Sequence, residues 1–439
     1  MGFQSNCFGT ALAIITFAAS GLWAQGSSSI RGQVTDSQKG VITSAAVSLA
    51  DKDTGASRTT VTSSSGEYQF LQLRPGTYML TVKAPGFTTK EVENVQLLVD
   101  TPVSLDVTLD VASSTSTVNV SAEAPPLNTV DATVGNAFEE KKIQALPLQT
   151  RNVVQLLSLQ PGVTQTGEVM GARRDQNNIM LDGIDNNDNQ NPLSGLNGTN
   201  GAGGLNSSNN SGFTSALPIP LDSVQEFRVT VAGDNASAGH SSGGQVQLVT
   251  RSGSNTLHGS AYEYNRNTAY TANNWFNNRA GVARPQLVRN QFGASLGGPA
   301  KKNKLFYFLN YERHIDSSQQ SQSRTVPSET LKQGIVKFKT TDGSVYTLNP
   351  SDVAAVDPLH QGVSPTMIAY LKQFPTGNSP QLGSDSGLNF SGYIFNAPVK
   401  LDYRTYVGRF DWMVDNAGKH TVSFRGTLSN NGETSVPAQ

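Results

Sequence analysis

The chain has 439 residues, a formal net charge of −1 and 15% charged residues, compared with roughly 25% in ordinary soluble proteins. So small a net charge gives no electrostatic reason to expect nucleic acid or an anionic membrane surface as a partner. The length allows two or three domains. Glycine is abundant, with 42 residues, which together with the low charge favours a β-rich protein with long polar loops.

The first residues resemble a secretory signal peptide, which we place at residues 1–24. An apolar run from Ala11 to Ala19 is followed by Leu22-Trp23-Ala24, although no basic residue precedes the run as such leaders usually require. A mis-assigned start is the alternative. Cys7, the single cysteine, lies in this segment, so the exported chain would have neither disulfides nor thiol chemistry. No later stretch has the 18 apolar residues of a spanning helix, so only a β-barrel could cross a membrane.

Residues 27–112 alternate apolar and polar side chains in short segments, with turn residues such as Gly66 and Pro75-Gly76 between them. Short strands at this spacing predict a small β-sandwich of about seven strands. The stretch SSSGEYQFLQLRPGTYMLTVKAPGF also resembles the carboxypeptidase-regulatory-like, prealbumin-type domain. Enzymes of that name bind zinc, but this segment carries none of the ligands.

The composition then changes to Ser, Thr, Pro and Ala, which indicates an exposed linker over residues 113–124. Further on, Val153, Leu156 and Leu157 recur at helical spacing before Pro161-Gly162 and predict a short amphipathic helix. Strand alternation returns in LDSVQEFRVTV and GGQVQLVTRSGSN. These elements indicate a small α+β unit.

The stretch QNNIMLDGIDNNDNQNP, from Gln176 to Pro192, crowds acidic and amide side chains together. A calcium-binding EF-hand loop that began at Asp185 would need Gly and Glu where Gln190 and Leu196 stand. Asp182-Gly183 fits a tight turn between two strands, because this pair adopts such geometry readily. We interpret the stretch mainly as a turn, followed by a long Asn- and Gly-rich loop.

Five strands are expected after Leu257, namely LHGSAYEYN, LVRNQFGASLG, KLFYFLNYERH, YRTYVGRFDWMVD and KHTVSFRGTLS. Their connections alternate between long and short, with a long segment from Ile315 to Asp402, as outer-membrane barrels require. In the fourth strand, aromatic and apolar residues alternate with Arg409 and Asp411. We expect lipid contacts from Tyr262, Tyr264, Phe306, Phe308, Phe410 and Trp412. An ordinary antiparallel sheet with one buried face is the alternative for each strand.

Enzyme chemistry has no support in the sequence. The five histidines are scattered without a metal-ligand spacing, and no nucleophile elbow, phosphate loop or dinucleotide fingerprint is present. We expect no catalytic residue, no metal site and no cofactor.

Several segments together resemble one family. They are LPLQTRNVVQLLSLQPGV, NNIMLDGIDNND, DSVQEFRVTVAGDNASAGHSSGGQVQLVTRSGSNTLHGSAYEYNRN, ANNWFNNRAG, VRNQFGASLGGPAKKNKLFYFLNYE and VGRFDWMVDNAGKHTVSFR. The chain resembles Oar-like TonB-dependent outer-membrane receptors of Gram-negative bacteria, particularly those of acidobacteria. The resemblance implies a mainly β fold: a prealbumin-like sandwich, a small α+β plug domain at 125–255 and an antiparallel transmembrane β-barrel from 256 to 439.

The resemblance also implies partners and sites. The partners would be a TonB-type energy-coupling protein, outer-membrane lipid and an unidentified extracellular ligand. The coupling segment would be TVNVSAEA, at Thr117, Val118, Asn119 and Val120, which as an unpaired linker could add to a sheet edge of the partner. A plain linker is the alternative. Plug loops that face the ligand would hold Arg173, Arg174, Asn177 and Asp188, with structural roles for the arginines equally open.

Transporters of this kind use 22 strands, whereas the segment after Asn255 supplies five. An open sheet leaves edges that lipid does not tolerate. The sequence therefore predicts a receptor that is incomplete in its barrel. A secreted or surface β-protein that binds carbohydrate or protein without transport is the alternative function.

Overall fold

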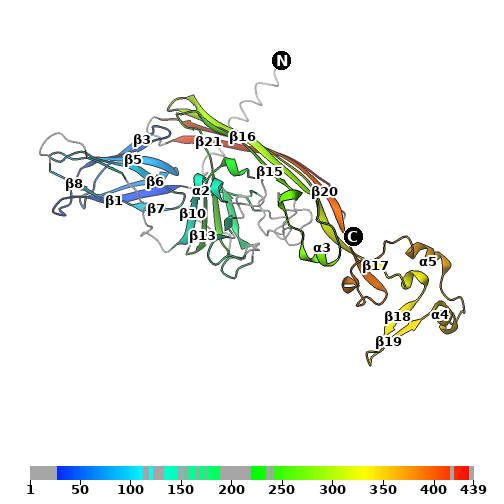
Figure 1. Ribbon diagram of the computed structural model, residues 1–439. Coiled ribbons are helices and arrows are strands. Elements are labelled where there is room, and N and C mark those ends of the chain that lie inside the picture. Colours follow the sequence, from blue (N-terminus) through cyan, green and yellow to red (C-terminus); the bar gives the residue numbers. More distant parts are fainter. Residues whose placement is uncertain are drawn as a thin grey trace, which may run out of the picture. The chain divides into compact units, whose positions relative to one another are not determined.

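The computed structural model describes residues 27–111, 118–121, 133–146, 219–233, 242–415 and 420–434, with shorter stretches at 151, 156–157, 159–164, 168–173, 176–187 and 239 (Figure 1). The expected signal peptide lies outside these residues. The chain forms two compact units. Unit 1 comprises Met1–Ala261, Gly293–Glu312 and Thr405–Ser429, and unit 2 comprises Tyr262–Phe292, Arg313–Arg404 and Asn430–Gln439.

The N-terminal part of unit 1 is a sandwich of two β-sheets, as the sequence predicted. One sheet has the order β4-β1-β7, with β8 also paired to β1, and the other has the order β3-β2-β5-β6-β9. The strands are β1 (Ser28–Asp36), β2 (Ala46–Asp51), β3 (Ser57–Val61), β4 (Glu67–Leu73), β5 (Gly76–Lys83), β6 (Lys90–Leu97), β7 (Pro102–Ser104), β8 (Val107–Leu109) and β9 (Val118–Ser121).

The sandwich core is built by alternation along each strand. In β4, Tyr68 and Phe70 are buried between exposed neighbours, and β5 buries Leu80 and Val82 in the same way. The buried Tyr68 hydroxyl donates to the Leu105 carbonyl at 2.6 Å, so its polar end is satisfied. Period-two burial of this kind is what a half-buried strand requires.

A third sheet in unit 1 has the order β10-β13-β14-β11-β12, and we call it the central sheet. The short helices α2 (Glu140–Ala145) and η4 (Leu221–Ser223) accompany it. Its core includes Phe227, Val229, Val246 and Leu248, all at most 1% exposed. The strands are β10 (Val134–Glu139), β11 (Asn178–Leu181), β12 (Ile184–Asp185), β13 (Val224–Ala232) and β14 (Gln245–Thr250).

The predicted helix around Val153 lies largely outside the described residues, but Leu156 and Leu157 are fully buried in the core of the central sheet. The expected turn at Asp182-Gly183 is confirmed. Strands β11 and β12 pair antiparallel across it, and both residues have positive φ, 52° and 81°. Two positive φ values define the tight hairpin turn for which Asp-Gly is favoured.

The remaining large sheet, which we call the long-strand sheet, has the order β15-β16-β17-β20-β21, and its five strands match the five predicted ones (Figure 1). They are β15 (His258–Asn267), β16 (Leu287–Lys301), β17 (Leu305–Pro327), β20 (Phe390–Met413) and β21 (Thr421–Thr434). The expected connection from Ile315 to Asp402 was too long, because β17 and β20 run on for 23 and 24 residues. Both strands are longer than the 9–11 residues that a membrane needs.

The two faces of this sheet differ. In β20, Phe410 and Trp412 are 44% and 50% exposed, whereas Arg409 and Asp411 are 7% and 1% exposed, as the alternation predicted. The expected lipid contacts of Phe306 and Phe308 were wrong, since both are 0% exposed. Neighbouring residues of β17 are turned the other way, with Leu309 at 45% exposure. Tyr262 and Tyr264 contact each other with ring centroids 5.6 Å apart.

Unit 2 contains short elements at two connections. Between β15 and β16 lie η5 (Thr268–Tyr270) and α3 (Trp275–Arg279). Between β17 and β20 lies a folded insertion at 328–389, with η6 (Leu331–Gln333), β18 (Val336–Lys339), β19 (Val345–Leu348), α4 (Pro350–Val356), α5 (Pro365–Leu371) and η7 (Pro380–Leu382). Within the described residues, no helix combines the length and the apolar character needed to span a membrane.

Candidate functional site

The Asp182 side chain connects the central sheet to the long-strand sheet within unit 1. Its Oδ1 accepts the Thr250 backbone N–H at 2.9 Å, and its Oδ2 accepts the Thr250 hydroxyl at 2.7 Å. The hairpin turn aims the carboxylate at the end of β14. Two arginines of the long-strand sheet form ion pairs with it, Arg409 and Arg425, each at 3.4 Å.

Arg409 makes contacts in two directions from the buried face of β20. Its Nη1 donates to the Thr250 carbonyl at 2.7 Å and to the Thr250 hydroxyl at 3.0 Å. Its Nε donates to Asp411 Oδ2 at 3.0 Å. One guanidinium therefore holds the end of β14 and a carboxylate on its own strand.

Asp411 extends this group of charges. Its Oδ1 accepts the Ser423 hydroxyl of β21 at 2.6 Å and lies 3.3 Å from Nη2 of Arg74, in the connection between β4 and β5. We call Arg74, Asp182, Arg409, Asp411 and Arg425 the charge network.

The charge network holds three cations and two anions, with side-chain exposures of 1% to 22%. Charges this buried are tolerated because they are paired and hydrogen-bonded. Removal of one partner from such a group costs about 3–5 kcal/mol, since the other charge stays buried without compensation. The network therefore fixes the position of the central sheet against β20 and β21.

A second contact joins the central sheet to the sandwich. The Val99 backbone N–H donates to both Glu226 carboxyl oxygens, at 2.8 and 3.0 Å. Arg228, two residues along β13, donates through Nη1 to the Val99 carbonyl at 3.1 Å and also to the Thr101 hydroxyl. Gln247 of β14 donates to Asp100 Oδ2 at 3.1 Å. We call these contacts the Val99 clamp.

Burial raises the pKa of Glu226 to about 8, although the Val99 N–H and then Arg228 oppose the shift. The side chain is 3% exposed, so its charged form loses most of its hydration. The clamp therefore contains a group that titrates near neutral pH.

The predicted coupling segment is not an unpaired linker. Thr117 lies outside the described residues, but Val118, Asn119 and Val120 belong to β9, which pairs parallel with β6. The sequence could not indicate this pairing, because four alternating residues do not specify a neighbour. Its role in coupling stays a prediction.

The predicted ligand-facing residues lie in different surroundings. Arg173 is exposed, and its backbone N–H donates to Gln176 Oε1 at 3.2 Å. Asn177 is 9% exposed, and its Oδ1 accepts the Gly244 N–H at 2.9 Å, which supports β14. Arg174 and Asp188 lie outside the described residues. Ligand contact stays a prediction for all four.

The acidic and amide side chains after the turn form hydrogen bonds with residues nearby in the sequence. Asp185 Oδ1 accepts the Asn187 backbone and side-chain N–H groups at 2.8 and 2.7 Å, and Asn187 Oδ1 accepts the Ile179 N–H at 2.9 Å. Over the described part of the chain, no three His, Cys, Asp or Glu side chains are grouped as metal ligands would be.

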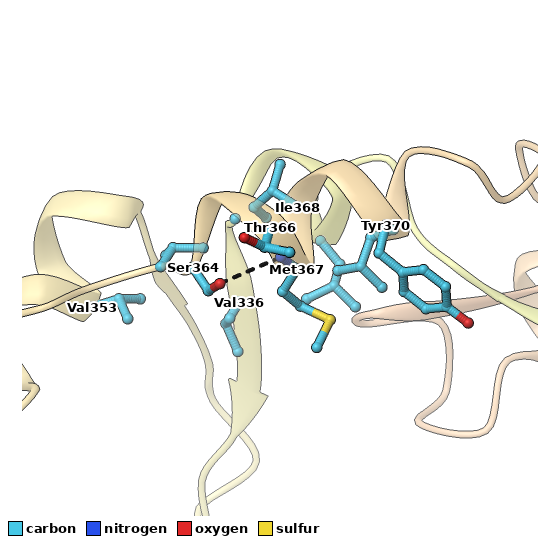
Figure 2. A pocket seen from close by; sticks show the side chains of 11 residues that line it. Val336, Val353, Ser364, Thr366, Met367, Ile368 and Tyr370 are labelled. Carbon is cyan, nitrogen blue, oxygen red and sulfur yellow. Dashed lines mark hydrogen bonds between the residues drawn. The ribbon is translucent and has the colours of Figure 1, made fainter.

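The insertion in unit 2 contains an apolar cavity of about 640 Å³. It lies between η6, β18, α4 and α5, and Figure 2 shows Met367 and Tyr370 beside it on α5. The Ser364 hydroxyl accepts the Met367 N–H at 3.4 Å as the cap of α5. None of the lining residues is charged. They are Leu331, Gly334, Val336, Val353, Val363, Ser364, Thr366, Met367, Ile368, Tyr370 and Leu371.

Sequence reasoning missed the charge network and the Val99 clamp as sites. Arg409 and Asp411 were recognised as the charged face of a strand, but their partners come from distant segments. The turn at Asp182 was predicted, but no binding partner was predicted for the Asp182 carboxylate. One sequence signal was available for both sites. Charged residues stand at strand positions where the alternation predicts burial, and such residues need charged or hydrogen-bonding partners.

Two protein families match parts of the chain. The outer membrane beta barrel domain matches residues 249–438, and the carboxypeptidase regulatory-like domain matches residues 29–110. The TonB-dependent transporter Oar of Myxococcus xanthus is 26% identical over 311 residues, which cover 65% of this chain and 26% of the transporter. The chain thus spans about a quarter of the length of that relative.

Two solved structures align over 68% of this chain and 33% of their own. They are the outer membrane transporter YddB from Escherichia coli, with a TM-score of 0.39, and a mutant of the ferric enterobactin receptor PfeA from Pseudomonas aeruginosa, with a TM-score of 0.36, each 14% identical. Catechol 1,2-dioxygenase from Pseudomonas arvilla C-1 aligns over 21% of the chain with a TM-score of 0.18. The relatives that cover most of the chain are transporters and receptors.

The two family matches lie in the order that the sequence predicted, with the regulatory-like domain before the barrel domain. The matched barrel domain places the protein in the outer membrane. With these two domains, the chain resembles the Oar-like TonB-dependent receptors of the outer membrane.

Proposed function

We propose that the protein is an energy-coupled receptor that takes up an extracellular ligand, with the central sheet as its plug. The charge network carries this proposal. A plug must be held firmly and still be movable, and ion pairs suit that task because their energy depends on geometry. A shift of the Asp182 turn by a few ångströms would separate Asp182 from both Arg409 and Arg425.

Energy coupling would use the segment at Thr117, Val118, Asn119 and Val120, through strand addition by a TonB-type protein. Strand addition relies on backbone hydrogen bonds, so it needs an extended segment at a sheet edge. The observation that supports this assignment is that β9 is extended and stands at the end of its sheet.

The ligand class can be argued from the insertion between β17 and β20. Long connections of outer-membrane barrels lie outside the cell, where the insertion would meet ligand first. Its cavity of about 640 Å³ lies within the usual range for small molecules. Its uncharged, mainly aliphatic lining suits an apolar group, because a charged group would lose hydration without a partner.

The proposed coupling is tested by photo-crosslinking in cells of the native host. A photoreactive amino acid replaces Asn119, and a matched variant carries it at Val345, which is 53% exposed in β19. We expect an adduct between position 119 and the TonB-type protein, and none from position 345. Equal yields at both positions, or no adduct at 119, would contradict the coupling assignment.

A further inference from the structure

Strand β9 is bound to the sandwich along its whole length. Four residue pairs join it to β6 in parallel, from Lys90 with Val118 to Glu93 with Ser121. In the order β3-β2-β5-β6-β9, β9 is the last strand. Among the strands that the structure describes, its second edge therefore pairs with none, and it offers backbone donors and acceptors to an added strand.

The strand that holds β9 leads directly to the central sheet. Strand β6 ends at Leu97, and Val99 follows two residues later. The Val99 N–H donates to the Glu226 carboxyl group, and the Val99 carbonyl accepts a hydrogen bond from Arg228, both on β13. A continuous route thus runs from β9 through hydrogen bonds to β6, along the backbone to Val99, and through the Val99 clamp to β13.

The same route continues to the charge network. Strand β13 pairs antiparallel with β14 from Val224 with Thr250 to Thr230 with Gln245, with one register shift between Val224 and Glu226. Thr250 at the end of β14 holds Asp182 and Arg409. Displacement of Val99 along β13 would therefore act on the strand that carries the retaining contacts.

We propose that the N-terminal sandwich is part of the docking surface for the coupling protein and transmits its pull to the plug. The partner strand adds to the open edge of β9 while β9 stays paired with β6. This inference rests on the proposed function, because it requires that the partner recognises the segment at 117–120.

Retention of β9 on β6 has a physical reason. Release would leave the backbone groups of Lys90–Glu93 without their strand partner, so exchange of partners gains no hydrogen bonds. Addition at the open edge gains a full ladder and loses none. A pulling force along β9 is parallel to both strands. It therefore loads the hydrogen bonds of all four residue pairs at the same time, rather than one pair after another.

An engineered disulfide between β6 and β9 tests this inference. Glu91 and Asn119 are directly paired, and Cα atoms of paired residues lie within the span that a disulfide bridges. The variant E91C/N119C is suitable because Cys7 is the only native cysteine, and it is replaced by Ser as well. The full chain in detergent is titrated with the purified periplasmic domain of the host TonB-type protein, in the oxidised and the reduced state.

We expect the oxidised variant to bind within about threefold of the reduced variant, since the docked strand is the binding form. Binding weaker by about tenfold or more when oxidised, and restored by reduction, would overturn the inference, because β9 would then have to leave the sandwich. Failure of the disulfide to form would overturn the pairing itself. If the unmodified chain does not bind the periplasmic domain at all, the proposed coupling function is wrong, and the inference that rests on it is wrong as well. The single variant E91C, treated in the same way, controls for oxidation.

Hydrogen exchange on the unmodified chain gives a second measurement that needs no cysteine. When the periplasmic domain is added, we expect slower exchange at residues 118–121 and unchanged exchange at residues 90–93. Faster exchange at residues 90–93 would show that β9 leaves β6 and would overturn the inference. The variant Thr101→Val, which removes one acceptor of Arg228, should leave binding unchanged and increase exchange at Val99.

Discussion

Asp182 and Thr250 are joined by two hydrogen bonds, from the Thr250 N–H to Oδ1 at 2.9 Å and from its hydroxyl to Oδ2 at 2.7 Å. The pair connects the β11–β12 turn to the end of β14. Arg409 binds both residues, since it donates to the Thr250 carbonyl and forms an ion pair with Asp182. The tight turn that the sequence predicted is therefore also the place where the central sheet is attached to β20.

Loss of Arg409 should loosen the central sheet. We expect Arg409→Leu to lower the free energy of opening of this sheet by about 3 kcal/mol, because Asp411 and Asp182 lose a buried partner. Asp182→Asn keeps the shape and should cost about 1–2 kcal/mol. Hydrogen exchange at the Val246 and Leu248 amides measures the change.

Arg404→Leu is the matched control for Arg409→Leu in the same strand. Arg404 is paired with Asp402 at 43% side-chain exposure, so its loss should cost at most about 1 kcal/mol. Equal effects of the two arginine substitutions would show that the charge network does not hold the central sheet.

The stability that buried Glu226 contributes to the folded state should fall as pH rises. Because burial raises the pKa of Glu226 to about 8, the clamp binds a proton that the free carboxyl, with its pKa near 4.5, releases. Its contribution to stability is complete below about pH 4.5 and is lost as pH rises through about 8. Exchange at the Val99 amide, compared with Leu97 and corrected for intrinsic rate, should accelerate over this interval. Glu226→Gln should flatten the profile, and an unchanged profile in that variant would assign the effect to another group.

Much of the fold could be predicted from local patterns. The sandwich, the five long strands and the Asp182-Gly183 turn each have a signal within a few residues, in alternation or in turn chemistry. The folded insertion was missed because its strands and helices are short and amphipathicity is weak over so few residues. The extension of β17 was missed because it is polar, whereas the extension of β20 alternates buried Ala397, Val399 and Leu401 with more exposed neighbours and was left out of the predicted strand.

The sites were less predictable than the fold. Phe306 and Phe308 were assigned to lipid because LFYFLNY is apolar on both faces, so alternation could not say which face is buried. Val99 and Glu226 are 127 residues apart, and no local pattern pairs them. The parallel pairing of β9 with β6 is also non-local and depends on an open edge that only the folded sandwich presents.

The exposed face of β20 should contact lipid. Phe410→Lys puts a charge on that face, where a lysine near the membrane midplane costs about 2–4 kcal/mol. We expect a smaller share of the variant in the carbonate-resistant membrane fraction, with Phe410→Tyr as the control that retains it. Equal retention of the lysine variant would place Phe410 away from the hydrocarbon region.

The apolar cavity of the insertion should bind an uncharged aromatic probe. Val353 lines the cavity, whereas Val356 of the same helix is 66% exposed and does not line it. We expect Val353→Asp to abolish the ligand-observed NMR signal of naphthalene with the chain in lipid nanodiscs, and Val356→Asp to preserve it. The same signal from both variants would mean that naphthalene binds elsewhere.

One titration tests whether a TonB-type protein binds this chain by strand addition at residues 117–120. The full chain in detergent is titrated with the purified periplasmic domain of the host protein, as wild type, Val120→Pro and Val120→Thr. Proline removes a backbone donor and fixes φ, whereas threonine keeps the backbone and suits a strand. We expect binding by wild type and Val120→Thr, and binding weaker by about tenfold or more for Val120→Pro. Equal binding by all three, or by none, would contradict it.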